Sequence, residues 1–424
     1  MNQHFSLGID RLLVSPVESF AEDFKNKRIA LLSHPAGVDS HGVPTIDSLT
    51  RYISHIPGAT LTALFGPQHG LRGEKQDNMV ESYDYQDPET GLPAYSLYGK
   101  TRRLTKEMLS TFDVLLVDLQ DVGVRVYTFL TTVGYLVEDL SQHPDKALII
   151  LDRPNPTGRL IEGNLLEPGW ESFVGIDAIP MQHGFTLGEF ALWFKEKHQL
   201  ATTLKVIPME GWDPTNPVNA WPKTLLWLQP SPNMPSVVTA RCYPGTVMLE
   251  GTTLSEARGT TRPLSQIGYP QLDWKKIMRW LSEYTHGQID PDSIGALIRY
   301  VAFQPTFHKH NGEITLGLEL IPEAQYYDPK KFKPFRLIAG LLKAIHELYP
   351  SIDLWSKPPY EYEFEKIPID VISGGTRFRS WVEDSKSTWI EFSRWLENDE
   401  QMWREVSCKW YLYPNNQEFT PGGN

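Results

Sequence analysis

The stretch Val114-Leu-Leu-Val-Asp118, followed directly by Leu119-Gln-Asp-Val-Gly123, sets the fold class of this chain. A short apolar run that passes into a polar, glycine-containing loop is typical of a strand buried on both faces. The same pattern predicts further strands at residues 28–33, 61–65, 94–97, 147–152 and 204–208. Helical segments are predicted between them at residues 45–54, 105–110, 127–140 and 186–197. This alternation predicts an α/β fold with a Rossmann-like, doubly wound parallel sheet.

The second half of the chain changes character from about Gly211. It begins rich in proline and tryptophan and then becomes polar and glycine-rich, with a strand predicted at 314–320 and helices at 335–348 and 387–404. We therefore expect a Rossmann-like domain over residues 1–210 and a second, smaller α+β domain over 211–424, joined by a linker near 209–222. Ligand sites favour domain interfaces, so we expect the active cleft between the two.

Charge and composition narrow the classes of function. The chain has 40 basic and 52 acidic residues, a formal net charge of −12, which argues against nonspecific binding to nucleic acid or to an anionic membrane. Two cysteines, Cys242 and Cys408, exclude a disulfide framework and a multi-cysteine zinc site, and two reduced thiols are favoured over one bridge. The sequence contains no Gly-x-Gly-x-x-Gly and no Walker motif, so no nucleotide cofactor and no metal is expected.

The first residues lack the basic segment, long apolar run and cleavage site of a signal peptide. The longest apolar runs are also far too short to span a membrane. The sequence as it stands predicts a cytoplasmic protein, or an extracytoplasmic one if a signal has been removed.

Four of the predicted strands end in loops that mix glycine or proline with polar side chains. These loops are His34-Pro-Ala-Gly37, Gly66-Pro-Gln-His-Gly70, Leu119-Gln-Asp-Val-Gly123 and Arg153-Pro-Asn-Pro156. In open α/β sheets ligands bind outside the carboxyl ends of the strands, so four such loops on one edge predict a site there. The alternative is that glycine and proline end the strands and the polar residues are solvated.

Individual residues of the first half are candidates for this site. Asp118 and Asp121 can accept sugar hydroxyls or move a proton, although either can instead cap a helix or pair with Arg125. Two prolines hold the loop around Asn155 rigid, which suits a binding residue and a structural turn alike.

Two further candidates lie beside glycines, Glu162 before Gly163 and His183 before Gly184. Thr186 and Glu189 form a Thr-x-x-Glu capping box, which favours a helix cap over a catalytic role for Glu189.

The second half contains one polar cluster, Leu249-Glu250-Gly251 through Glu256-Ala-Arg258. Glu250 and Glu256 can accept hydroxyls, and Arg258 can clamp a carboxylate through two hydrogen bonds. The alternative is a Glu256–Arg258 surface pair, which contributes at most about 1 kcal/mol.

An ordered series of motifs resembles one enzyme family. The motifs are His34-Pro-Ala-Gly37, Leu64-Phe-Gly-Pro-Gln-His-Gly-Leu-Arg-Gly73, Ser96-Leu-Tyr-Gly99, Asp118-Leu-Gln-Asp-Val-Gly123, Asp152-Arg-Pro-Asn-Pro156, Ile161-Glu-Gly163, Pro230-Ser-Pro-Asn-Met-Pro235, Glu250-Gly-Thr252 and Gly259-Thr-Thr261. The chain is similar, from Gly8 to the closing Tyr-Leu-Tyr at 411–413, to exo-acting β-N-acetylmuramidases of the NamZ type. The resemblance implies release of N-acetylmuramic acid from the non-reducing end of peptidoglycan fragments, with an active site between a Rossmann-like and a smaller domain. Peptidoglycan-derived saccharides are therefore the expected ligands, and protein partners stay undefined.

One position departs from that family. The family motif is Gly-Pro-Glu-His-Gly, in which the glutamate is the proposed catalytic residue, and here the position is Gln68. An amide cannot deliver the proton that cleavage of a β-glycoside needs. Gln68 can be an inactivating substitution, the acid can lie elsewhere (Glu74 is the nearest carboxylate in sequence), or the protein binds muropeptides without cutting them. The runner-up function is therefore a non-catalytic muropeptide-binding or sensing protein.

The resemblance and the loops together give a candidate site. The residues expected near the chemistry are Gln68, Glu74, Asp118 and Asp121. The expected substrate-binding residues are His69, Arg72, Arg125, Arg153, Asn155, Glu162, His183, Glu250, Glu256 and Arg258. Among these, the four arginines are expected to supply the charge that grips the lactyl carboxylate of muramic acid.

Overall fold

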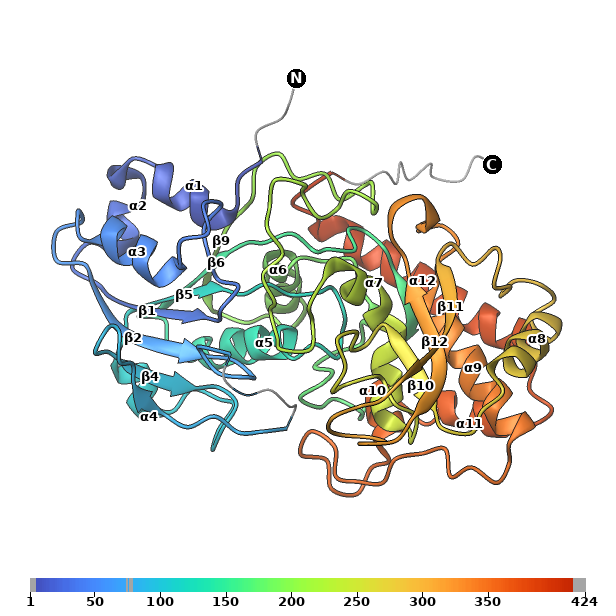
Figure 1. The fold of residues 1–424 in the computed structure, drawn as a ribbon. Helices are drawn as coiled ribbons and strands as arrows, with labels where there is room; N and C mark the ends of the chain where they lie inside the picture. The colour runs from blue at the N-terminus through green and yellow to red at the C-terminus, as the bar shows by residue number, and fades with distance from the viewer. Residues whose placement is uncertain (1–4, 74, 76–78, 415–424) are drawn as a thin grey trace, which may run out of the picture.

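A seven-stranded sheet forms the centre of the first domain in the computed structural model, which describes residues 5–73, 75 and 79–414 (Figure 1). From one edge to the other the strands are β3 (Tyr85–Gln86), β4 (Pro93–Ser96), β2 (Thr60–Gly66), β1 (Arg28–Ser33), β5 (Val114–Asp118), β6 (Ala147–Leu151) and β9 (Thr203–Ile207). Neighbouring strands are parallel except β3, which is antiparallel to β4. If β3 is left out and the other six strands of this sheet are numbered along the chain, their order across the sheet is 3-2-1-4-5-6, which is the Rossmann order. The predicted fold class and its six strands are confirmed.

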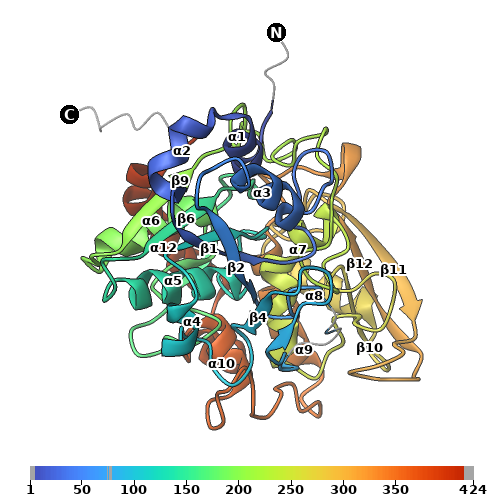
Figure 2. The same cartoon turned by 90° about the vertical axis from the view of Figure 1, so that its left-hand side faces the viewer.

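Successive residues of the central strands enter two different hydrophobic cores, because side chains alternate across a sheet. In β1, Ile29 and Leu31 pack in a core with residues of α1 and α3, whereas Ala30 and Leu32 pack in the core that contains residues of α5 and α6. The helices of this domain are α1 (Gly8–Val14), α2 (Val17–Phe24), α3 (Thr45–Ile53), α4 (Lys106–Ser110), α5 (Phe129–Leu140) and α6 (Leu187–Lys197). Figure 2 shows α1 to α3 on one side of the sheet and α4 to α6 on the other. Two covered faces explain why these strands are apolar almost throughout.

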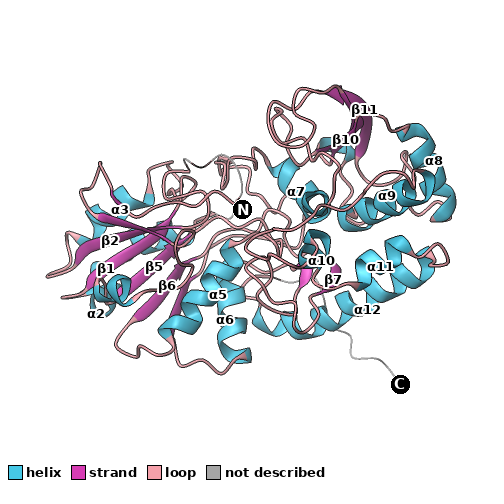
Figure 3. Cartoon of the chain, turned by 90° about the horizontal axis from the view of Figure 1, so that it is seen from below, coloured by secondary structure: helices cyan, strands magenta, loops and turns pink. Residues whose placement is uncertain are grey.

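The second domain combines a small antiparallel sheet with helices (Figure 3). Its strands lie in the order β10 (Gln266–Tyr269), β12 (Thr315–Ile321) and β11 (Leu297–Phe303). Its helices are α7 (Val237–Thr246), α8 (Trp274–Tyr284), α9 (Pro334–Leu348), α10 (Pro368–Ser373), α11 (Arg377–Glu383) and α12 (Trp389–Ser407), with short 3₁₀ segments η1 (Val247–Gly251), η2 (Ala324–Tyr326) and η3 (Cys408–Trp410). Cys242 and Cys408 are both free thiols, as the sequence favoured.

A hairpin of the first 210 residues is built into the second domain. Its strands β7 (Glu162–Leu165) and β8 (Pro180–Gln182) both contact α12. Glu162 also accepts hydrogen bonds from the backbone amides of Phe335 (3.2 Å) and Arg336 (3.0 Å). Glu162 therefore caps the first turn of α9. The domain boundary predicted at residue 210 stays a prediction. Within the described residues, no helix is long and apolar enough to cross a membrane.

Candidate functional site

Residues of both domains line a narrow pocket with about 430 Å³ of empty space, its open mouth included. The strand β2 ends beside it, and in Figure 1 the arrowheads of β2 and β5 point toward the second domain. The lining residues are Gln68, His69, Val126, Tyr127, Thr128, Val174, Ser231, Asn233, Met234, Tyr243, Glu250, Arg258, Leu264, Tyr360 and Glu361. A larger groove lies beside α3, but residues of the first domain alone line it. We take the smaller pocket as the candidate site because polar groups of both domains converge in it.

Gln68 enters the pocket from the loop that follows β2. His69 and Gly70 both have positive φ, 73° and 88°, and the amide of Gly70 donates to the carbonyl of Pro67, so the chain makes a tight turn here. The buried Gln68 side chain accepts a hydrogen bond from Oγ1 of Thr128 (2.7 Å) and donates one from Nε2 to Oε1 of Glu361 (3.1 Å). Gln68 therefore links the end of β2 to the second domain, while its neighbour His69 lines the same pocket.

Glu361 is the pocket carboxyl group that the sequence analysis missed. Its Oε2 accepts a hydrogen bond from the hydroxyl of Tyr98 (2.7 Å), and the residue is only 4% exposed. Burial is the largest influence and, with the charge of Glu250, raises the pKa of Glu361 to about 7, against the hydrogen bonds from Tyr98 and Gln68. Glu361 lies 293 positions after Gln68. Pro358 and Pro359, which precede it, indicate a rigid loop, but they do not indicate where that loop lies in the fold.

Arg258 brings a positive charge to the pocket wall. Its Nη2 lies 2.6 Å from Glu250, and its Nε lies 3.3 Å from Glu256. Burial works against the cation, but the two carboxylates hold the pKa of Arg258 above its usual value. The Glu256–Arg258 pair is thus buried, not on the surface as the alternative had it.

Glu256 lies behind this arginine and does not line the pocket. It is fully buried between Lys309 (3.0 Å) and His308 (3.3 Å) as well as Arg258. Burial opposes its ionisation, yet the charges of Lys309 and Arg258 and the hydrogen bond from His308 hold the pKa of Glu256 below the usual range. Glu256 is therefore placed to hold Arg258 in position.

Three of the four predicted arginines lie away from the pocket. Arg72 pairs with Asp87 (2.9 Å) and Glu89 (2.8 Å). The guanidinium of Arg125 is fully buried and donates to four backbone carbonyls, those of Asn164, Ile179, Ile372 and Ser373. Arg125 thus ties the first domain to the end of α10, and Arg258 is the one of the four that lines the pocket.

The polar residues at the end of β5 contact neighbours in the first domain and not the pocket. Asp118 accepts hydrogen bonds from Thr45 and from Arg153, whose Nη2 lies 2.8 Å from Oδ2. Asp121 accepts one from the amide of Gly123 (2.6 Å) and lies 3.9 Å from Nε2 of His183. Burial raises the pKa of Asp121 to about 7, but none of these residues lines the pocket.

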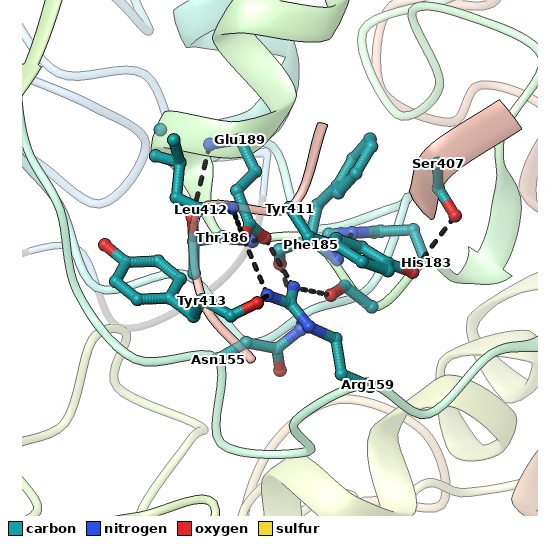
Figure 4. Close-up of polar contacts among 12 residues, drawn as sticks. Asn155, Arg159, His183, Phe185, Thr186, Glu189, Ser407, Tyr411, Leu412 and Tyr413 are labelled. Carbon is teal, nitrogen blue, oxygen red and sulfur yellow. Dashed lines mark hydrogen bonds and ion pairs between the residues drawn. The ribbon is translucent and has the colours of Figure 1, made fainter. Parts of the chain in front are cut away.

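Asn155 and His183 lie in a cluster that residues 411–413 close (Figure 4). Asn155 donates to the carbonyl of Phe185 (3.0 Å) and accepts from the amide of Thr157, so it stabilises a turn. Nδ1 of the buried His183 accepts from the amide of Phe185 (3.1 Å). The structure therefore places both outside the pocket.

The last described residues complete that cluster (Figure 4). Arg159 pairs with Glu189 (2.6 Å) and lies over the ring of Tyr411. Thr186 and Glu189 form the predicted capping box of α6. The hydroxyl of Tyr413 donates to Asp152 at the end of β6 (2.6 Å). The closing Tyr-Leu-Tyr segment thus contacts the carboxyl end of β6. The candidate Glu74 lies outside the described residues.

Comparisons with known proteins bear on both domains. The family model for the N-terminal part of the exo-beta-N-acetylmuramidase NamZ matches residues 29–238, and the model for its C-terminal part matches residues 241–413. The chain belongs to the exo-β-N-acetylmuramidase NamZ family. It is 37% identical over 382 residues to the peptidoglycan beta-N-acetylmuramidase NamZ of Bacillus subtilis (strain 168), a match that covers 90% of this chain and 84% of that protein.

The fold is also shared with two crystal structures of Bacteroides fragilis proteins, both described as DUF1343 family proteins. One has a TM-score of 0.80 at 30% identity, covering 97% of this chain and 99% of the other. The second has a TM-score of 0.72 at 25% identity, covering 97% and 100%. The predicted resemblance is therefore confirmed.

Several of the sequence motifs on which the predicted resemblance was based are far apart in the chain and meet in the pocket. They are represented there by Gln68 and His69, by Ser231 and Asn233, and by Glu250. Tyr98, which belongs to the motif Ser96-Leu-Tyr-Gly99, donates a hydrogen bond to Glu361. Thr128, Tyr243, Tyr360 and Glu361 lie outside those motifs, and sequence reasoning missed them as site residues.

Proposed function

We propose that this chain is an exo-acting glycosidase that releases N-acetylmuramic acid from the non-reducing end of peptidoglycan fragments. The observation that carries the proposal is the pocket shared by the two NamZ parts, with a cation and two carboxyl groups in its wall.

We assign Arg258 to the lactyl carboxylate of the bound sugar. A guanidinium forms paired, charge-assisted hydrogen bonds with a carboxylate, and Arg258 is the predicted arginine that lines the pocket. Glu250 and His69 line the same wall, and we assign them to the sugar hydroxyls. The lactyl group distinguishes muramic acid from N-acetylglucosamine, so this arginine accounts for the selectivity of the proposed reaction.

Gln68 favours a second candidate, a protein that binds muropeptides without cleaving them. Its side chain occupies the position of the glutamate in the family motif, and an amide does not transfer a proton. Hydrolysis by this chain therefore requires another acid in the pocket.

Hydrolysis of a chromogenic β-N-acetylmuraminide tests the two candidates. The chain as given and its Gln68→Glu variant are assayed side by side, with the corresponding β-N-acetylglucosaminide as the control substrate. We expect the chain as given to hydrolyse the muraminide and to prefer it to the glucosaminide. Tight muropeptide binding by calorimetry, without hydrolysis by either protein, would establish the binding protein instead.

A further inference from the structure

Glu361 completes the pocket wall next to Gln68 and is held in one position. Its Oε1 accepts from Nε2 of Gln68 (3.1 Å), and its Oε2 accepts from the hydroxyl of Tyr98 (2.7 Å). Each carboxyl oxygen has two lone pairs, so the group can carry a proton while both hydrogen bonds persist. This firm placement suits a group that must meet a reacting atom at a defined distance.

The backbone at Glu361 is also unusual. Glu361 and Tyr362 have φ values of 44° and 71°, in the left-handed region that residues with a Cβ rarely adopt. The amide of Glu361 donates to Sδ of Met79 (3.3 Å), and Tyr360 exchanges backbone hydrogen bonds with Glu363. Such conformations persist where the surroundings impose them, and they concentrate at active sites.

The two carboxyl groups of the pocket have different partners. Glu250 is paired with the Arg258 guanidinium at 2.6 Å and accepts from the hydroxyl of Tyr360. Glu361 instead accepts from an amide and a phenol, which are neutral donors. Neutral donors favour ionisation less than a cation does, so the partners of Glu361 let it retain a proton more easily than a guanidinium partner would.

The other titratable groups around Glu361 come from several elements. They are Tyr98 and Arg102 after β4, Glu250 in η1, Tyr243 in α7, and the adjacent Tyr360 and Tyr362. Burial, with the charge of Glu250, raises the pKa of Glu361 to about 7, while Tyr98, Gln68 and Arg102 act in the opposite direction. A group with this pKa is partly protonated at neutral pH and can act as an acid there.

We infer that Glu361 is the general acid of this pocket and protonates the glycosidic oxygen, a role that rests on the proposed function above. The C1–O bond breaks with its electron pair remaining on the leaving oxygen, which takes the proton of Glu361. Water supplies the hydroxyl group that C1 acquires, and its second proton restores the acid. Gln68 is then a positioning residue for Glu361, and a glutamine at this position is compatible with turnover.

The dependence on leaving group tests this inference. A β-N-acetylmuraminide with a nitrophenyl leaving group needs little protonation, whereas N-acetylmuramyl-N-acetylglucosamine needs a full proton on its leaving oxygen. We expect Glu361→Gln to lose at least about 100-fold in kcat/KM on the disaccharide and clearly less on the aryl substrate. Glu365→Gln is the matched control, because Glu365 lies in the same loop and is exposed. Circular dichroism and thermal unfolding verify that the variants are folded.

The outcomes separate the inference from the proposed function. An equal loss on both substrates, or activity that requires Gln68→Glu, would overturn the role of Glu361 and leave the muramidase function standing. Inactivity of both the chain as given and Gln68→Glu would overturn both. Should Glu361→Gln not fold, Tyr98→Phe provides a second test. Loss of the Tyr98 hydrogen bond raises the pKa of Glu361, so the alkaline limb of kcat/KM must move to higher pH, and an unmoved limb contradicts the inference.

Discussion

Arg258 and Glu250 form a buried ion pair, 2.6 Å between Nη2 and Oε1, within the wall of a pocket that both domains build. A second carboxylate, Glu256, holds the same guanidinium from behind at 3.3 Å. The cation is therefore fixed before any ligand arrives, and this preorganisation lowers the cost of binding an anionic sugar.

Replacement of Arg258 is expected to change selectivity. Arg258→Lys keeps the charge but loses the planar fork, and a hydrogen bond to a charged group contributes about 1.5–3 kcal/mol. We expect the ratio of kcat/KM for the muraminide over the glucosaminide to fall by about tenfold or more. Arg262→Lys, at an exposed arginine of the same loop, must leave the ratio unchanged. An unchanged ratio in Arg258→Lys would refute the assignment of the lactyl carboxylate.

Gln68→Glu is expected to move the pH profile. The new carboxyl group would face Glu361 where an amide now donates at 3.1 Å. Two carboxyl groups this close cannot both ionise easily, so the pair holds one proton to higher pH. The alkaline limb of kcat/KM should therefore lie at higher pH in Gln68→Glu than in the chain as given. Superimposable profiles would show that Gln68 and Glu361 are not coupled in solution.

Arg125 is expected to matter for stability and not for selectivity. Its guanidinium donates to four buried carbonyls, of which those of Ile179 and Ser373 also accept from a second donor, and a buried acceptor left without a partner costs about 1–3 kcal/mol. Arg125→Met should lower the free energy of unfolding in urea by at least about 3 kcal/mol, compared with little change in the exposed-helix control Arg51→Met. The folded variant should keep its preference for muraminides. A changed preference at unchanged stability would mean that Arg125 meets the substrate.

Asp121 is expected to make stability depend on pH. Burial raises its pKa from 3.8 to about 7 in the folded state, and its Oδ1 has no hydrogen-bond partner among the described residues. Between about pH 4 and 7 the unfolded chain has lost this proton and the folded chain retains it, so stability falls as pH rises. In Asp121→Asn that fall should be smaller, as measured by urea unfolding at several pH values.

Asp113 is expected to change stability with pH in the opposite direction. The hydrogen bond from Arg28 lowers the pKa of Asp113 to about 2. The ionised Asp113 therefore stabilises the fold above about pH 4, and this stabilisation is lost as the pH falls below that value. Asp113→Asn should therefore leave the slope between pH 4 and 7 unchanged. An equal slope in Asp121→Asn and the parent chain would contradict the raised pKa of Asp121.

Local patterns were enough to predict six of the seven strands of the sheet and the helices α3 to α6, whereas α1, α2 and β3 were not predicted. The apolar runs of β1, β2, β4, β5, β6 and β9 and the capping box of α6 are visible over a few residues, because strand burial and helix capping depend on neighbours in the chain. The motifs likewise identified the NamZ family, and four of the residues singled out from the sequence, Gln68, His69, Glu250 and Arg258, line the pocket.

The partners of the polar strand ends could not be predicted in the same way. Asp118 could pair with Arg125, with Arg153 or with a ligand, and the structure pairs it with Arg153 and Thr45. Every buried polar group needs some partner, but which one it finds depends on how distant segments pack. This is why several strand-end candidates became structural links.

The sequence by itself determined the α/β architecture and the family of this protein, since both reside in short patterns read along the chain. Only the tertiary structure decided which carboxyl group faces Gln68. Glu361 is 293 positions away, and its raised pKa comes from burial in a pocket that does not exist until the two domains pack together.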